Sequence, residues 1–289
     1  MGIRKIRDIH KIRYFSSVIT ISNGRVTKVT KPTISHCPLA GFLYKGLKRS
    51  GDLPLSRIKD DIKKVIEGKI EWFGFCSKDR VLWNDEVSVP YGASEIVAYG
   101  LKNKAIDSSV IVCDGAGTVV ASIPQVVQGI GARMHSVIRT SAIPEVVNRL
   151  RRFGCNVIND DGSIDQKKGV IEAAKEGHKN IAVTVSAYSG ESLKSIRGLE
   201  KQLGISVTIL VVCTTGIDIE RINEIGKYAD LVWACRSKEV RNVLCIKAIE
   251  ILSDASPVYV ITEKGKRLVH GYSPNIFKMR KKIERDIEK

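Results

Sequence analysis

Three of the seven cysteines stand where apolar runs typical of β-strands end. Cys113, Cys213 and Cys235 each close such a run, and a polar or glycine-containing turn follows each of them. In an open parallel sheet, ligands bind beyond the carboxyl ends of the strands, so these thiols would share one edge. A single cysteine in such a place is more often part of the core, whereas three at equivalent positions favour a functional site.

Thiolates at this edge would support one of two chemistries. The first is binding of an iron–sulfur cluster or another thiophilic metal. The candidate ligands are Cys37, Cys76, Cys113, Cys213 and Cys235. The chain has no Cys-x-x-Cys pair, so these ligands would have to come from distant loops. The second chemistry needs no metal: Cys113 would be a nucleophile, activated by the backbone amides around it.

A glycine-rich loop follows Cys113. Asp114 would orient a base, hold a metal or cap a helix, and the glycines after it would allow a backbone to approach an anion closely. The predicted anion-binding residues are Gly115, Gly117, Thr118, Gly129, Gly131 and Arg133. Neither glycine pair has the third glycine of the dinucleotide fingerprint, and the chain contains no P-loop. A tight structural turn therefore explains the first loop as well as a phosphate site does.

Composition narrows the class of protein. The 289-residue chain carries a net charge of +16, concentrated in residues 1–31 and 275–289. Such ends could attract an acidic protein or RNA. No RNA-binding motif accompanies the basic ends, so a contribution to solubility and thermostability is the preferred explanation of their charge.

No apolar run is long enough to cross a membrane, and no signal peptide is evident. We therefore expect a cytoplasmic protein with reduced cysteines and no membrane contact.

The spacing of apolar residues predicts the elements that position these groups. Residues 17–30 indicate a β-hairpin around Asn23-Gly24, and residues 55–67 indicate a helix that Gly68 ends. The strands expected after it are 109–113, 155–158, 180–186, 206–213, 230–235 and 257–262. The helices expected among them are 94–105, 124–131, 144–153, 164–176, 191–203, 217–228 and 238–252. This alternation predicts an α/β fold, a mostly parallel sheet with helices on both faces.

The elements divide the chain into three regions. Residues 1–92 are a smaller N-terminal α+β part that begins with the β-hairpin and continues into a cover rich in aromatic residues and cysteine. Residues 93–265 are the α/β domain, and residues 266–289 are a basic helical tail. No long flexible linker separates the first two regions, so we expect them to share a cleft.

Several stretches together resemble a known family. The most specific is residues 105–119, which contains Val-Cys-Asp-Gly-Ala-Gly-Thr at positions 112–118. Supporting motifs are His36-Cys37-Pro38, Phe73–Cys76, Gly92–Glu95, Gln128–Gly131, Thr140–Glu145, Thr214–Gly216 and Ala234-Cys235. Over about residues 17–265, the chain resembles the methanogenesis marker protein 8 family, an archaeal family of uncharacterised function.

The resemblance implies a methanogenic archaeal host and a role near methanogenesis. Such a role is the assembly or activation of methyl-coenzyme M reductase or its nickel cofactor, with that enzyme or its assembly factors as partners. Our first hypothesis is therefore an accessory or maturation protein with a cysteine-lined metal or iron–sulfur site. The second is an enzyme that binds a phosphorylated small molecule on the glycine loops. The third is a non-catalytic module that binds an acidic protein or RNA.

Overall fold

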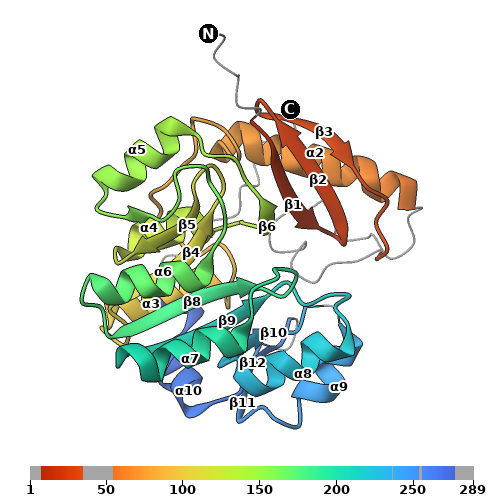
Figure 1. Ribbon diagram of the computed structural model, residues 1–289. Coiled ribbons are helices and arrows are strands. Elements are labelled where there is room, and N and C mark those ends of the chain that lie inside the picture. Colours follow the sequence, from red (N-terminus) through yellow and green to blue (C-terminus); the bar gives the residue numbers. More distant parts are fainter. Residues whose placement is uncertain (1–7, 35–54, 236, 254–255, 277–289) are drawn as a thin grey trace.

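A computed structural model describes residues 8–34, 55–235, 237–253 and 256–276. The described residues form a small sheet close to the N-terminus and a large sheet that carries most of the chain (Figure 1). Among these residues, no helix combines the length and the apolar character that a bilayer crossing requires.

The small sheet, as far as the structure describes it, is antiparallel with the strand order β3-β2-β1-β6. Its strands are β1 (His10–Tyr14), β2 (Ser17–Ser22), β3 (Arg25–Val29) and β6 (Ser136–Arg139). The hairpin predicted over residues 17–30 is confirmed. Asn23 and Gly24 both have a positive φ, which the two-residue turn between right-twisted strands requires.

Helix α2 (Leu55–Phe73) packs against the small sheet through one apolar stripe. Its Ile58, Ile62 and Ile66 are fully buried against side chains of β1 and β2. The prediction that Gly68 ends this helix is wrong. The helix continues to Phe73 and stops at Gly74, where φ is 63°. A glycine inside a helix costs only about 1 kcal/mol, and burial of Phe73 on the same stripe offsets that cost.

Four parallel strands form the centre of the large sheet. They are β4 (Ser108–Cys113), β8 (Asn180–Ser186), β9 (Ser206–Val212) and β10 (Leu231–Trp233), and they lie side by side in the order β10-β9-β8-β4. Their side chains are buried on both faces of the sheet, which explains why their sequences are continuous apolar runs.

The large sheet is nevertheless mixed, and the prediction of a mostly parallel sheet is corrected. Antiparallel strands β5 (Gly117–Ala121) and β7 (Asn156–Val157) extend it beyond β4, while β12 (Val258–Val260) and β11 (Glu250–Leu252) extend it beyond β10. The reasons are local. Residues 114–116 make a tight turn from β4 into β5, and the helix expected over 238–252 ends at Leu244, which leaves room for β11.

Helices cover both faces of the large sheet, as predicted. One face carries α3 (Ala93–Lys102), α4 (Pro124–Gly131), α5 (Pro144–Arg152) and α10 (Glu263–Val269). The other face carries α6 (Gln166–Lys175), α7 (Leu193–Leu203), α8 (Ile219–Tyr228) and α9 (Lys238–Leu244). A short 3-10 turn, η3 (Pro274–Ile276), ends the described chain.

The two sheets are connected by a strand that crosses the expected domain boundary. Strand β6 belongs to the segment 93–265 but pairs with β1 in the small sheet. Through this pairing the small sheet is held over the carboxyl ends of the parallel strands.

The predicted boundary between the α/β domain and the basic helical tail falls inside α10, which begins at Glu263 and packs on the large sheet with Leu268 and Val269 buried. Residues 277–289 of the predicted tail lie outside the described part.

Candidate functional site

A cavity of about 260 Å³ lies at the carboxyl ends of the parallel strands, where the two sheets meet. Residues at the ends of β4, β8, β9 and β10 line one side of it, and β1 and the segment before β6 line the other. Ligands of open α/β sheets bind at this position, because loops and helix N-termini converge there. The volume is a little below the ~300–1,000 Å³ of drug-sized sites, which suits a small molecule.

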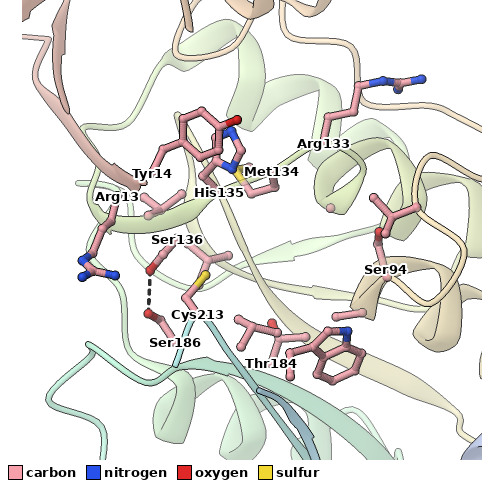
Figure 2. A pocket seen from close by; sticks show the side chains of 18 of the residues that line it. Arg13, Tyr14, Ser94, Arg133, Met134, His135, Ser136, Thr184, Ser186 and Cys213 are labelled. Atoms are coloured by element: carbon pink, nitrogen blue, oxygen red, sulfur yellow. Dashed lines mark hydrogen bonds between the residues drawn. The ribbon is translucent and has the colours of Figure 1, made fainter. Parts of the chain in front are cut away.

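The cavity has an apolar body and a polar side. Its apolar lining includes Tyr14, Phe15, Val89, Val97, Ile111, Val127, Ile130, Met134, Val137, Val212 and Trp233. Its polar lining includes Arg13, Ser94, His135, Ser136, Thr184, Ser186, Cys213, Thr215 and Cys235. In Figure 2, Arg13, the Ser136–Ser186 pair and Cys213 gather on one side, with Ser94 on the other. The shape suits an amphipathic ligand.

Two of the predicted cysteines, Cys213 and Cys235, line this cavity. They follow the neighbouring parallel strands β9 and β10, and their backbones are left-handed, with φ of 60° and 46°. This conformation is unfavourable for residues with a Cβ and clusters at functional sites. Burial raises the pKa of the Cys235 thiol, and hydrogen bonds from the backbone amides of Thr214 and Cys213 partly offset that rise.

Arg13 brings a positive charge to the polar side. Its guanidinium stacks on the ring of Tyr188, 3.6 Å from the ring centroid, and its charge acts on the thiols of Cys213 and Cys235. Among the described residues, no carboxylate pairs with Arg13 and no group accepts a hydrogen bond from its guanidinium. An arginine whose donors the described residues leave open is suited to a carboxylate, phosphate or sulfonate.

Hydroxyl groups connect the loops around this charge. The hydroxyls of Ser136 and Ser186 are hydrogen-bonded at 2.5 Å, which joins β6 to β8 across the gap between the sheets. The hydroxyl of Tyr188 donates to the carbonyl of Thr215, which joins the loop after β8 to the loop after β9. The polar side of the cavity is thus held in place before any ligand arrives.

His135, which lines the cavity, pairs with a buried lysine. Lys69 is 1% exposed, and its ammonium donates to the carbonyl of Arg133 and, at 2.7 Å, to Nε2 of His135. The His135 ring stacks on Tyr14 with the ring centroids 4.0 Å apart. Burial, together with the charge of Lys69, lowers the pKa of His135 well below its ordinary value. His135 is therefore neutral, with Nε2 accepting and the proton on Nδ1.

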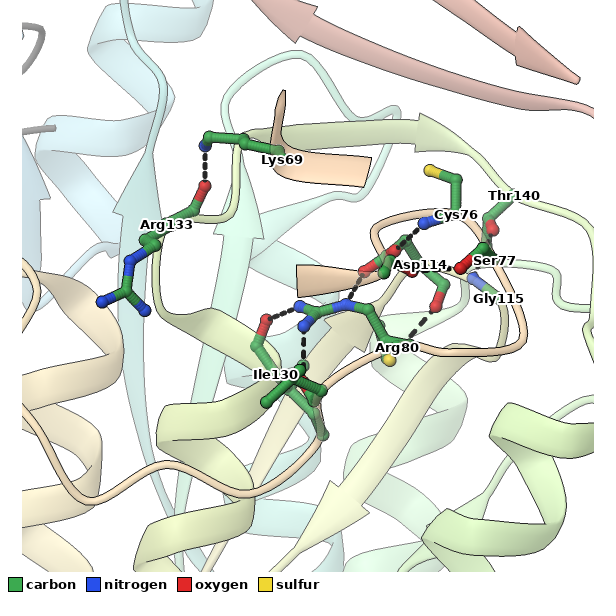
Figure 3. Close-up of polar contacts among 12 residues, drawn as sticks. Lys69, Cys76, Ser77, Arg80, Asp114, Gly115, Ile130, Arg133 and Thr140 are labelled. Atoms are coloured by element: carbon green, nitrogen blue, oxygen red, sulfur yellow. Dashed lines mark hydrogen bonds and ion pairs between the residues drawn. The ribbon is translucent and has the colours of Figure 1, made fainter. Parts of the chain in front are cut away.

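Cys76, Cys113 and Asp114 do not line the cavity. Figure 3 shows Cys76 and Asp114 in a closed polar cluster with Arg80, and the thiol of Cys113 donates to the carbonyl of Asp114. The carboxylate of Asp114 accepts a hydrogen bond from Nε of Arg80 at 2.8 Å and one from the amide of Cys76 at 2.5 Å. Arg80 also donates to the carbonyls of Val81 and Ile130. The four side chains are each at most 1% exposed, so this cluster is part of the core.

The expectation that Cys76 and Cys113 join Cys213 and Cys235 around one hollow is therefore not met. Strand β4 turns directly into antiparallel β5, so Cys113 lies in the core instead of opening onto a strand–helix loop. Burial raises the pKa of the Cys113 thiol far above its ordinary value, which disfavours it as a nucleophile. Cys37 lies outside the described residues.

No group of three or more His, Cys, Asp or Glu side chains in the described part of the chain is arranged to hold a metal ion. Cys213 and Cys235 supply two thiolates, whereas an iron–sulfur cluster needs about four ligands. The described residues therefore do not fit a complete cluster site.

The first glycine loop is a tight turn packed against protein. A Cβ on Gly117 would lie 2.4 Å from the carbonyl oxygen of Ser163, and one on Gly115 would lie 3.0 Å from Cδ1 of Ile143. The hydroxyl of Thr118 donates to Oε1 of Gln166 at 2.7 Å. Protein atoms thus occupy the space that a phosphate would need, so the structural interpretation of this loop is the better one.

Two of the predicted anion-binding residues, Gly131 and Arg133, do line the cavity. Gly129 and Gly131 belong to α4, where a Cβ on Gly129 would lie 2.2 Å from the carbonyl of Leu82. Arg133 follows with a φ of 62°, and its guanidinium stacks over the ring of Phe73 at 4.4 Å. Figure 2 shows this side chain turned away from Cys213, so it contributes little charge beside the thiols.

Sequence reasoning missed Arg13 and Tyr188. Arg13 belongs to β1, which was not predicted, although charged Lys11 and Arg13 alternate with Ile12 and Tyr14 in the sequence as in a half-buried strand. That alternation was the available signal. Tyr188 follows the strand end at Ser186, and only the fold places it under Arg13.

Fold and site define the class: an α/β protein with a mixed sheet, covered by helices on both faces, and a ligand-sized cavity at the carboxyl edge of its parallel strands. Residues 10–272 match the family described as an uncharacterized protein conserved in archaea (DUF2099), and the chain belongs to that family. It is also 38% identical, over 252 residues, to the uncharacterized protein MJ0054 of Methanocaldococcus jannaschii, an alignment covering 87% of this chain and 85% of that protein. The archaeal part of the expected relationship is confirmed.

Proposed function

We propose that this protein is a cytoplasmic accessory or maturation protein of methanogenesis that binds a small amphipathic anion in the cavity between its two sheets. The observation that carries the binding function is Arg13. Its guanidinium lies at the polar side of an otherwise apolar cavity, stacked on Tyr188, with no carboxylate partner among the described residues. A ligand with an acidic group and an aliphatic or aromatic body complements both features.

The link with methanogenesis comes from the sequence. The segments that resemble the methanogenesis marker protein 8 family extend over most of the chain and include the strand ends at the cavity. In this proposal the ligand is a substrate, an intermediate or a cofactor piece used when methyl-coenzyme M reductase or its nickel cofactor is assembled or activated.

Binding of hexylphosphonate tests the proposal, with hexanol as the neutral probe of equal chain length. A charge-assisted contact with arginine is worth about 1.5–3 kcal/mol, so the phosphonate should bind roughly ten- to a hundredfold more tightly than the alcohol. The Arg13→Met variant should bind the two probes about equally, because the apolar body of the cavity remains. Isothermal titration calorimetry measures all four affinities.

Lys11→Gln is the matched control, because Lys11 is an exposed residue of the same strand. It removes one positive charge and should leave the preference for the phosphonate unchanged. Equal affinities of the two probes for the unaltered protein would contradict the proposal. So would a preference that Arg13→Met retains.

A soft-metal site is the second candidate, favoured by the position of Cys213 and Cys235 on neighbouring strands at one cavity. Two thiolates suit a soft metal that takes its remaining ligands from a bound molecule. Anaerobic purification with elemental analysis tests it. A stoichiometric metal that is lost in Cys213→Ser and in Cys235→Ser, and kept in Cys113→Ser, would support this candidate over simple anion binding.

A further inference from the structure

The parallel register brings Cys213 and Cys235 together. In β9 and β10, Leu210 lies beside Leu231 and Val211 beside Val232. Strand β9 ends at Val212 and β10 ends at Trp233, so Cys213 and Cys235 both follow the ends of these neighbouring strands and both line the same cavity. Neighbouring strands lie about 4.8 Å apart, and disulfides span Cα separations of about 4.4–6.8 Å.

Hydrogen bonding agrees with this proximity. Burial raises the pKa of the Cys235 thiol, and the backbone amides of Thr214 and Cys213 partly offset that rise, as expected if the loop after β9 lies beside this sulfur. The thiolate that such amides favour is the form that attacks a disulfide and the form that leaves one. Both cysteines also hold left-handed backbones that only well-packed surroundings maintain.

Other cysteines lack this combination. Cys76, Cys113 and Cys155 are buried in the core, away from the cavity. Cys245 is exposed, at the end of α9, and does not line the cavity. Among the described cysteines, only the pair at positions 213 and 235 combines a neighbouring thiol with access to a cavity and a positive charge beside it.

We propose that Cys213 and Cys235 form a redox-active dithiol that reduces a disulfide bond in an anionic organic ligand held by Arg13. The inference deepens the proposed function and rests on it, because Arg13 supplies the contact to the anion. The ligand inferred here is a low-mass disulfide that carries an acidic group and an apolar body.

Two thiol–disulfide exchange steps convert the ligand disulfide into two thiols. The sulfur of Cys213, whose side chain points into the cavity (Figure 2), attacks one sulfur of the ligand. The ligand disulfide breaks, the first half leaves as a thiolate, and a mixed disulfide forms on Cys213. The sulfur of Cys235 then attacks Cys213, the second half leaves, and a Cys213–Cys235 disulfide remains. The protein thiols lose two electrons and two protons, and the two released thiols gain them.

The test uses the full chain with Cys37→Ser and Cys245→Ser, so that these two cysteines do not react. The probe is dithiobis(nitrobenzoate), an anionic aromatic disulfide whose released thiol is coloured. We expect one molecule of probe to release two coloured thiols per protein and to leave a Cys213–Cys235 disulfide, located by mass spectrometry of peptides. With Cys235→Ser added, one thiol should be released and the mixed disulfide should remain on Cys213. Cys113→Ser should behave like the parent.

Dithiodipyridine, a neutral disulfide, separates this inference from the proposed function. Arg13→Met should slow the reaction of the anionic probe at least tenfold more than that of the neutral probe, which loses only the effect of the Arg13 charge on the thiols. If the protein disulfide closes with both probes but Arg13→Met has no selective effect, anion binding by Arg13 is refuted while the dithiol stands. If Arg13→Met slows the anionic probe selectively but no protein disulfide closes with either probe, the dithiol is refuted while anion binding stands.

Discussion

The carboxylate of Asp114 and the guanidinium of Arg80 carry opposite charges inside the core. Both are at most 1% exposed, and hydrogen bonds from the amide of Cys76 and to the carbonyl of Ile130 complete their contacts. Removing two charges from water is costly, and their mutual attraction offsets that cost only while both are present. Asp114, a candidate catalytic residue from its sequence context, therefore acts as a structural residue that positions the segment containing Cys76.

Asp114→Asn tests this role at the scale of one residue. The variant keeps the size of the side chain but leaves the charge of Arg80 buried without a carboxylate, so unfolding should need about 3–5 kcal/mol less. Urea unfolding followed by circular dichroism measures the loss. The control is Asp160→Asn, because Asp160 is 87% exposed and pairs with Arg151 at the surface, where the change should be at most about 1 kcal/mol. Similar losses in both variants would contradict the structural role.

His135 makes a prediction about pH. Burial and the charge of Lys69 lower the pKa of this imidazole well below its ordinary value. Below about pH 6.5 the unfolded chain takes up a proton at this histidine and the folded protein does not, so stability falls as the pH falls. His135→Gln should reduce that slope by up to about 1.4 kcal/mol per pH unit between about pH 6 and pH 5. Urea unfolding at the two pH values measures it, and an unchanged slope would show that His135 is protonated in the folded protein.

At the scale of elements, helix α4 is positioned by close backbone packing. Gly129 lies against the backbone of Leu82, and Gly131 against the side chain of Ser94 in α3. The approach sets the C-terminal end of α4 at the cavity wall, where Ile130 and Gly131 line it. We predicted from the sequence that these glycines bind an anion. Their role in the structure is to let α4 pack closely against Leu82 and Ser94, because a larger residue at either position would collide with them.

Gly129→Ala and Gly198→Ala make a matched pair. Both glycines are inside helices, and helix propensity alone favours alanine by about 1 kcal/mol at each. The new Cβ at position 198 in α7 meets nothing within 4 Å, so that variant should become more stable. The new Cβ at position 129 would be 2.2 Å from the backbone of Leu82, so that variant should lose stability, by roughly 1–3 kcal/mol. Thermal unfolding compares them, and a gain in both variants would contradict the packing argument.

Strand connections also decide which thiols can react. Cys113 and Cys213 each stand at the end of a buried parallel strand. After β4 the chain reverses into β5, whereas after β9 it enters the loop that borders the cavity. The turn after β4 therefore encloses the sulfur of Cys113, whereas the loop after β9 leaves the sulfur of Cys213 open to a ligand.

At the scale of the whole molecule, the cavity exists because the two sheets are joined. Strand β6 lies in the small sheet beside β1, and the Ser136–Ser186 hydrogen bond ties it to the large sheet. Arg13 and Tyr14 enter the cavity from β1, while both thiols come from the large sheet. Neither sheet alone has a complete site.

A split chain tests this dependence. Residues 93–289 produced alone should form aggregates or unfold without a cooperative transition, because β6 loses β1 and apolar side chains at the junction become exposed. Produced together with residues 1–92, they should copurify and recover binding of hexylphosphonate. A soluble fragment 93–289 that unfolds cooperatively and binds the probe alone would refute the joint site.

By itself, the sequence determined the local elements: the hairpin at Asn23-Gly24, most helices, and the apolar parallel strands with thiols at their ends. These depend on periodicity and turn residues, which act over a few positions. Only the tertiary structure decided that the large sheet is mixed, that Cys113 is enclosed while Cys213 is open, and that Arg13 faces the thiols across the junction. Those outcomes depend on pairing between strands far apart in the chain, and hydrophobic patterning, which reports burial, does not encode the partner of a strand.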